Sequence, residues 1–142
     1  MCTRKDYRMT DPDLSTLIEQ AINVAQKAYV PYSHFPVGAA LRTNDGTVFS
    51  GCNVENAAYP SGICAERTAL VKAVSEGYRL FDIIVVASVA GGSPCGQCRQ
   101  MLYEFAPDLR VVLVDFDGAI HHDLTLRTLL PLGFGPESLP HP

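Results

Sequence analysis

Apolar residues recur at helical spacing near the start of the chain. Asp11 and Pro12 are typical of a helix start, because an aspartate can cap the first turn and proline needs no N–H there. Pro31 marks the end of the pattern. We therefore predict an amphipathic helix that packs against a sheet. Its apolar face consists of Leu14, Leu17, Ile18, Ala21, Ile22, Val24, Ala25 and Ala28.

Short apolar runs follow, each bounded by turn residues. Strands are expected at residues 37–41 and 48–52, joined by the hairpin signal Asn-Asp-Gly at 44–46. Small residues in the first of these strands indicate that another element approaches it closely. The continuous β-branched runs at 83–87 and 111–114 are typical of strands that are covered on both faces.

Helical segments alternate with these strands. Helices are expected at residues 65–76, 98–105 and 126–130, and a short edge strand at 119–121. The order αββαβαββα predicts an α/β fold in which a mixed five-stranded sheet lies between helical layers, a three-layer α/β/α arrangement.

Length and composition restrict the class of protein. A chain of 142 residues suits a single domain, 1–142, with a flexible leader at 1–10 and a Gly- and Pro-rich tail at 131–142. No apolar run is long enough to span a membrane, and the opening residues do not resemble a secretory signal. The net charge of −4, with Lys and Arg scattered along the chain, disfavours a nucleic-acid partner and favours a small substrate.

The five cysteines need an explanation other than disulfides, because their number is odd and a reducing cytoplasm is the expected setting. Cys95 and Cys98 form a Cys-x-x-Cys pair at a helix start, and Cys64 lies at another helix start. Helix N-termini favour thiolates, and three soft sulfur ligands suit tetrahedral zinc. Three protein ligands leave the fourth position open to water, as a catalytic zinc site requires.

Other interpretations of the cysteines remain open. A Cys-x-x-Cys pair by itself also fits a redox pair or half of a structural site. Cys52 is a candidate fourth ligand, but it falls in a strand pattern and is interpreted as a small buried hydrophobe. Cys2 lies in the leader. The histidines show no ligand spacing and are expected in loops or at the surface; they are His34, His121, His122 and His141.

Charged residues flank the predicted ligands. Three thiolates and Zn²⁺ sum to −1, so a cation should compensate, and Arg67 and Arg99 are both adjacent to the ligand segments. A solvated surface arginine is the alternative for each, and we predict that Arg67 has the compensating role. Glu66 lies two residues after Cys64 and is expected to move a proton from the zinc-bound water, rather than to be a charge on the helix surface.

The sequence Cys-Ala-Glu-Arg at 64–67 with Pro-Cys-Gly-Gln-Cys-Arg at 94–99 resembles the zinc-dependent cytidine deaminases, specifically the small homotetrameric type with three cysteine ligands. The resemblance implies one Zn²⁺ per subunit and hydrolytic deamination of cytidine and deoxycytidine to uridine and deoxyuridine, with release of ammonia. Glu66 would pass the proton of water to the base and then to the leaving amino group. Pyrimidine salvage in the cytoplasm is the implied role.

The resemblance also assigns substrate contacts. Asn53 and Glu55 match the pair that hydrogen-bonds the ribose 3′-hydroxyl, which agrees with their place just past a strand end. Phe35 matches the aromatic residue that packs on the pyrimidine ring. The Ala65 N–H would polarise the base carbonyl, and the Ser93 carbonyl would accept a hydrogen bond from the amino group.

Two further aromatic residues match positions that reach the site of a neighbouring subunit. These are Tyr59 and Phe134, the latter in the tail at 131–142, so the resemblance implies a homotetramer with shared active sites. From the sequence without the resemblance, plain core packing is the alternative for Phe35 and Phe134.

Three competing functions are weighed against this one. A deaminase of a nucleoside antibiotic such as blasticidin S resembles this type at its zinc motifs, but the pair Asn53 and Glu55 favours a ribose. A polynucleotide-editing deaminase is disfavoured by the acidity of the chain and by a cysteine in place of the histidine of His-x-Glu. A zinc-stabilised binding module without catalysis is the third alternative.

Overall fold

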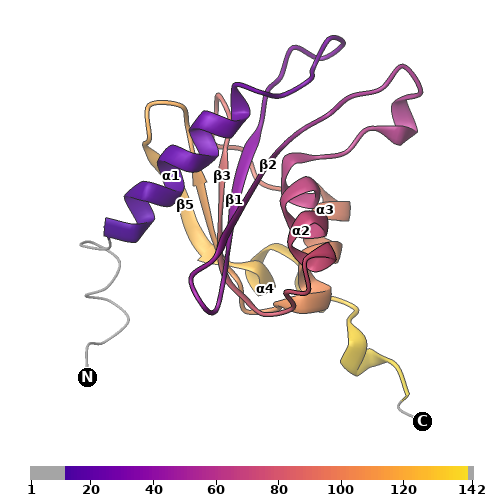
Figure 1. The fold of residues 1–142 in the computed structure, drawn as a ribbon. Coiled ribbons are helices and arrows are strands. Elements are labelled where there is room, and N and C mark those ends of the chain that lie inside the picture. Colours follow the sequence, from indigo (N-terminus) through magenta and orange to yellow (C-terminus); the bar gives the residue numbers. More distant parts are fainter. Residues whose placement is uncertain (1–11, 141–142) are drawn as a thin grey trace.

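A computed structural model describes residues 12–140 and shows one mixed sheet with helices on both faces (Figure 1). The predicted leader at 1–10 and the last two residues of the tail lie outside the described residues. The helices are α1 (Pro12–Ala25), α2 (Ala65–Ser75), α3 (Gly96–Phe105) and α4 (Leu126–Leu129). The strands are β1 (Gly38–Thr43), β2 (Val48–Cys52), β3 (Phe81–Ala87), β4 (Arg110–Val114) and β5 (Ile120–Thr125). Two 3₁₀ turns, η1 (Tyr59–Ser61) and η2 (Pro136–Ser138), complete the elements.

The sheet has five strands in the order β2-β1-β3-β4-β5. β1 pairs antiparallel with β2 and β3, β3 pairs parallel with β4, and β4 pairs antiparallel with β5. The predicted order of helices and strands and the mixed five-stranded sheet are therefore confirmed. Within residues 12–140, no helix is both long enough and apolar enough to cross a membrane.

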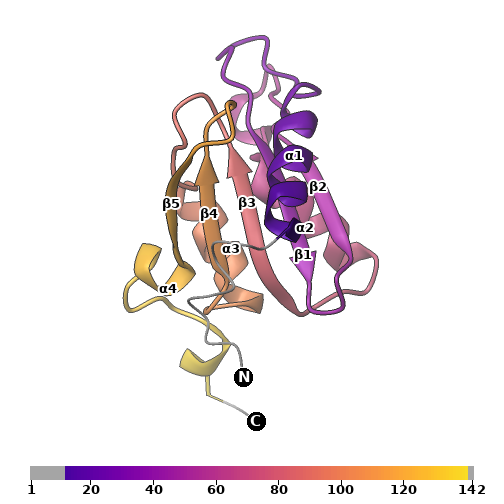
Figure 2. The same ribbon diagram turned by 90° about the vertical axis from the view of Figure 1, so that its left-hand side faces the viewer.

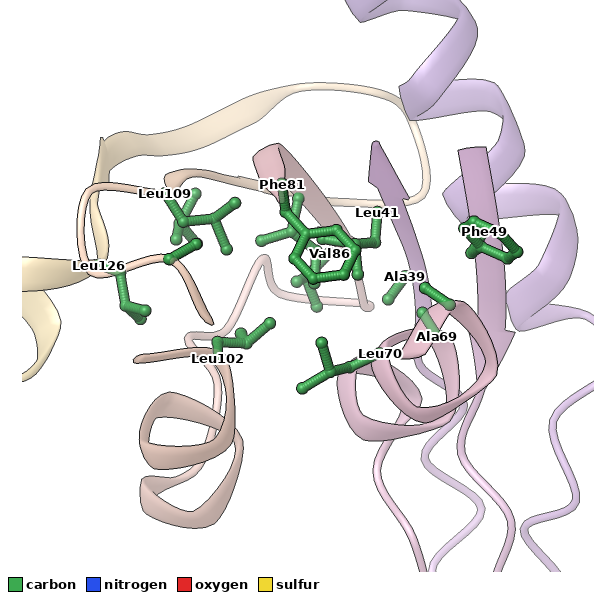
Figure 3. Packing of buried hydrophobic residues seen from close by; sticks show 14 of the residues in the cluster. Ala39, Leu41, Phe49, Ala69, Leu70, Phe81, Val86, Leu102, Leu109 and Leu126 are labelled. Atoms are coloured by element: carbon green, nitrogen blue, oxygen red, sulfur yellow. The ribbon is translucent and has the colours of Figure 1, made fainter. Parts of the chain in front are cut away.

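The two faces of the sheet carry separate apolar clusters, which makes the fold three-layered (Figure 2). α1 covers one face, where Leu14, Leu17 and Ala21 pack on alternate residues of the central strands. α2 and α3 cover the other face, where Leu70 and Leu102 point toward the strands (Figure 3). β3 and β4 are buried on both faces, as their continuous apolar runs predict.

Two element boundaries differ from the sequence-based expectation by three or more residues. α1 ends at Ala25 rather than near Ala28. The backbone N–H groups of residues 26–28 donate to the carbonyl oxygens three residues earlier, as in a 3₁₀ turn, instead of four residues earlier. β5 extends to Thr125, well beyond the predicted 119–121. Its polar residues do not alternate with apolar ones, so its length is set by pairing with β4, including the Arg110–Asp123 ion pair at 2.8 Å.

The small residues of β1 allow the close approach that was predicted for that strand. A Cβ at Gly38 would lie 1.9 Å from the carbonyl oxygen of Ala21 and 2.8 Å from the nitrogen of Ala25, both in α1. Glycine is required here for space, so that the end of α1 can rest directly on the sheet.

We expect Gly38→Ala to lower the free energy of unfolding by about 1–3 kcal/mol or more, because α1 must move away from β1 to admit the methyl group. Thermal unfolding measures the change. Gly92→Ala is the matched control, since its new Cβ would lie 3.9 Å from its nearest neighbour, the Ser88 hydroxyl. Equal melting temperatures for the two variants would contradict this account of the packing.

Candidate metal centre and active site

The N-termini of α2 and α3 bring the three predicted ligands together. Cys64 is the N-cap of α2, Cys95 is the N-cap of α3, and Cys98 lies in the first turn of α3. Both helices pack on the same face of the sheet and contact each other. The sequence therefore places each thiol at the positive end of a helix, where thiolates are favoured.

The distances between the sulfurs suit one zinc ion. The Sγ atoms of Cys64 and Cys95 are 3.7 Å apart, those of Cys95 and Cys98 are 3.5 Å apart, and all three lie within 4.8 Å of one another. Tetrahedral coordination with Zn–S bonds of about 2.3 Å gives sulfur separations of about 3.8 Å. Among residues 12–140 this is the only group of three or more potential metal ligands, and Cys52 is not part of it.

The pKa values of Cys64 and Cys98 are shifted in opposite directions. A hydrogen bond from Cys98, aided by the Arg67 guanidinium, lowers the pKa of Cys64 to about 5. The same hydrogen bond and burial raise the pKa of Cys98, which is fully buried. The thiolate form of Cys64 is therefore favoured, and a metal ion that binds all three sulfurs would displace the remaining thiol protons.

Of the two candidate arginines, Arg67 contacts a ligand. Its Nη2 lies 3.6 Å from Cys64 Sγ, and its buried Nε finds no hydrogen-bond partner in the part of the chain that the structure describes. Arg99 instead donates to three oxygens, at 2.8 Å to Pro94 O, 2.7 Å to Leu129 O and 2.8 Å to the Ser93 hydroxyl. The interpretation of Arg99 as a solvated surface residue is therefore wrong.

Glu66 is enclosed beside the thiols. Its side chain is only 5% exposed, and Oε2 lies 3.6 Å from the sulfur of Cys98. Burial raises the pKa of the carboxyl group, so the protonated form is easier to reach than at the surface. The alternative of a charge on the helix surface is excluded for this residue.

Asn53 and Glu55 lie past the end of β2 and hold the loop between α1 and β1. Asn53 accepts a hydrogen bond from Val37 N and donates one to Phe35 O, both at 2.9 Å. Glu55 accepts from the backbone N–H groups of Tyr32, at 3.0 Å, and Ser33, at 3.1 Å, and from the Ser33 hydroxyl.

These hydrogen bonds, that of the Ser33 side chain above all, lower the pKa of Glu55 and keep it an ionised acceptor. Sequence reasoning did not identify Ser33, because its partner lies 22 residues away.

The aromatic residues predicted to contact substrate are exposed in this chain. Phe35 is 44% exposed, Tyr59 75% and Phe134 57%, so none of them belongs to the core. Tyr59 lies in η1 and borders an open pocket that Tyr32, Ser33 and Glu55 also line. The segment that contains η1 and the tail that begins at residue 131 leave the body toward opposite ends of the molecule (Figure 1).

The remaining predicted contacts flank the thiol cluster. Ala65 is the first residue of α2 and is fully buried. Ser93 precedes Pro94 and Cys95 in the loop after β3, and its hydroxyl is held by Arg99. Because Ala65 and Ser93 directly adjoin ligand segments, their backbone groups are positioned by the same two helix starts.

The geometry defines an α/β domain with a three-thiol zinc site and a buried carboxyl group beside it. Residues 12–114 match the family described as cytidine and deoxycytidylate deaminase zinc-binding region. The chain therefore belongs to this family of zinc-dependent hydrolytic deaminases.

Individual relatives agree with this assignment. The chain is 47% identical over 130 residues to a cytidine deaminase of Sporosarcina psychrophila, covering 89% of this chain and 95% of the relative. The crystal structure of a cytidine deaminase from Burkholderia pseudomallei is similar with a TM-score of 0.80 and 50% identity, covering 84% of this chain and 98% of that one. A blasticidin-S deaminase of Bacillus cereus is 33% identical over 140 residues, covering 92% and 97%.

We expect Cys98→Ser to lose most of its zinc and Cys52→Ser to retain about one ion per chain, because a hydroxyl is a poor replacement for a thiolate ligand. Zinc per chain, measured by elemental analysis of the purified variants, decides the matter. Loss of zinc from the Cys52 variant would mean that the ligand set is wrong.

Proposed function

We propose that this protein catalyses the hydrolytic deamination of cytidine and deoxycytidine to uridine and deoxyuridine, releasing ammonia, in cytoplasmic pyrimidine salvage. The observation that carries the proposal is the buried Glu66 carboxyl group beside three clustered thiols. A structural zinc site has no use for an enclosed acid at this place, whereas replacement of an amino group by a hydroxyl requires proton transfers.

Glu66 would carry these protons. Zinc held by the three thiols supplies an acidified water molecule and so lowers the barrier to attack at C4. Glu66 takes a proton from the attacking water and delivers it to N3 of the base. It then transfers the proton of the new hydroxyl group to the amino group, so that the C4–N bond breaks and ammonia and a carbonyl result. Its raised pKa suits a group that must hold the proton between the two transfers.

Arg67 would limit the negative charge of the ligands. Three thiolates leave a zinc site at −1, which makes its water less acidic. The guanidinium beside Cys64 Sγ withdraws part of that charge through a charge-assisted hydrogen bond.

The substrate contacts would come from both sides of the thiol cluster. Asn53 Nδ2 has a second proton and Glu55 Oε2 a further lone pair, so both can bind a ribose 3′-hydroxyl while they hold the loop. Phe35 would pack on the pyrimidine ring. The Ala65 N–H and the Ser93 carbonyl would bind the base carbonyl and the amino group.

The exposure of Tyr59 and Phe134 supports shared sites. We infer a homotetramer in which both residues, and with Phe134 the tail at 131–142, enter the site of a neighbouring subunit. Aromatic residues are enriched at protein–protein interfaces, and both of these side chains are exposed and available for such a contact. A nucleic-acid partner is not expected, since the net charge is −4.

We expect the purified protein to convert cytidine to uridine. The reaction can be followed by the change in ultraviolet absorption. Glu66→Gln keeps the size of the side chain but cannot carry a proton, so turnover should fall by several orders of magnitude while zinc stays bound. Blasticidin S in place of cytidine tests the antibiotic alternative. Zinc-loaded protein that leaves cytidine unchanged, or a Glu66 variant with a tenth of the activity, would refute the proposal.

Phe134→Ala should raise the KM for cytidine, and an excess of Glu66→Gln subunits in mixed tetramers should restore it. The active sites would then belong to the Phe134 variant, while their neighbours supply an intact Phe134. KM per active site, measured over a series of mixing ratios, follows the rescue. A KM that is independent of the mixing ratio would show that the sites are not shared.

A further inference from the structure

Helix α3 connects the thiol cluster with the C-terminal tail. Gln100 Nε2 donates a hydrogen bond of 2.8 Å to the carbonyl oxygen of Phe134. Its neighbour Arg99 donates at 2.7 Å to the carbonyl of Leu129, one of the last carbonyls of α4 that has no partner within its own helix. Two consecutive residues of α3 therefore hold the chain where it leaves α4 and again at Phe134.

The same helix shapes the backbone on both sides of Phe134. A Cβ at Gly133 would lie 2.9 Å from Cζ of Tyr103, and a Cβ at Gly135 would lie 2.9 Å from Cε1 of the same ring. Neither glycine has a positive φ, so glycine is required for space against the ring rather than for its backbone conformation. Tyr103 itself is only 4% exposed and its hydroxyl accepts a hydrogen bond of 3.3 Å from Arg127.

The backbone around Phe134 is thus held, whereas its ring is not. Gly135 is buried and the Phe134 carbonyl is bonded, yet the side chain is 57% exposed. An exposed aromatic ring on a fixed backbone is typical of a residue that anchors another protein surface. Its backbone is already ordered, so less conformational entropy is lost on binding.

We propose that Arg99, Gln100 and Tyr103 are positioning residues that hold Phe134 in the conformation in which it enters the substrate pocket of a neighbouring subunit. We call these three residues the tail seat. The inference rests on the proposed function, since it requires shared sites. It assigns α3 two roles, with its first turn in its own metal centre and its outer side serving the pocket of a neighbour.

Contacts within the tail do not replace the seat. Most of the tail's own hydrogen bonds, such as Ser138 N to Gly135 O at 2.9 Å, follow Phe134, and the one turn before it, Gly133 N to Leu130 O at 3.1 Å, does not connect the tail with α3. Without the seat, the segment between α4 and η2 would have to be ordered on assembly, at a cost in conformational entropy.

Gln100 is the residue through which the tail seat can be tested without disturbing a second site. Arg99 also holds the loop that leads to the thiols, through Pro94 O and the Ser93 hydroxyl, so its replacement would disturb two sites at once. Gln100 is exposed and donates to the tail, and Gln100→Glu keeps the shape while removing the donor.

In homomeric enzyme, Gln100→Ala and Gln100→Glu should raise the KM for cytidine about three- to tenfold, the factor that one lost hydrogen bond represents. The kcat, the zinc content and the melting temperature should stay close to those of the wild type. Glu104→Gln, at an exposed position of the same helix, is the control and should leave KM unchanged. An unchanged KM in both Gln100 variants would overturn the proposal.

Mixed tetramers show whether Gln100 acts on the active site of a neighbouring subunit or on that of its own subunit. Gln100→Glu chains assembled with an excess of Glu66→Gln chains should regain the wild-type KM, because each working site receives Phe134 from a neighbour with an intact seat. If Phe134→Ala chains are rescued in this way and Gln100→Glu chains are not, Gln100 acts within its own subunit and the seat is refuted. If neither is rescued, the shared site fails and the seat fails with it.

Discussion

The close packing of α2 against β2 is the constraint on which the metal centre depends. A Cβ at Gly51 would lie 2.6 Å from the nitrogen of Ala69, so the helix and the strand approach to the limit that glycine allows. Ala65 and Ala69 on the facing side of the helix are small and fully buried. If α2 lay further out, Cys64 would move with it while the thiols of α3 stayed in place, and the three sulfurs would no longer fit one tetrahedral ion.

The electrostatics of the site follow from this packing. Two helix N-termini and the Arg67 guanidinium face three sulfurs and a carboxyl group that is nearly enclosed. Burial of the Glu66 carboxyl group is unfavourable for its charged form and raises its pKa, and the nearby Arg67 offsets only part of this effect. Zinc bound by the three thiols would connect the N-termini of α2 and α3, so the metal would stabilise the fold that creates its site. The same burial suits Glu66 to the proposed role of proton carrier, because the raised pKa makes the protonated form easier to reach.

The fold and the metal ligands could be predicted because their signals are local. Continuous apolar runs identified β3 and β4, and Cys-x-x-Cys at a helix start identified a ligand pair. The missed features depend on distant partners. Arg99 bonds residues 5, 6 and 30 positions away, and the polar pattern of β5 carries no strand period. The positions of Arg67 and Arg99 in the sequence do not show which of the two contacts a thiol, because the orientations of α2 and α3 on the sheet decide this.

The contacts of α3 with both the metal centre and the tail suggest a physical reason for the proposed assembly. The pocket lined by Tyr32, Glu55 and Tyr59 is open at the surface of one subunit, and a deaminase benefits from closing its site to bulk water. A closing residue must be placed accurately relative to the chemistry it covers. In this chain the helix that begins at the thiols also holds the backbone of Phe134. In the proposed tetramer, each subunit would present Phe134 from the same helix that contributes to its own metal centre, and a symmetric assembly would repeat that relation at every site.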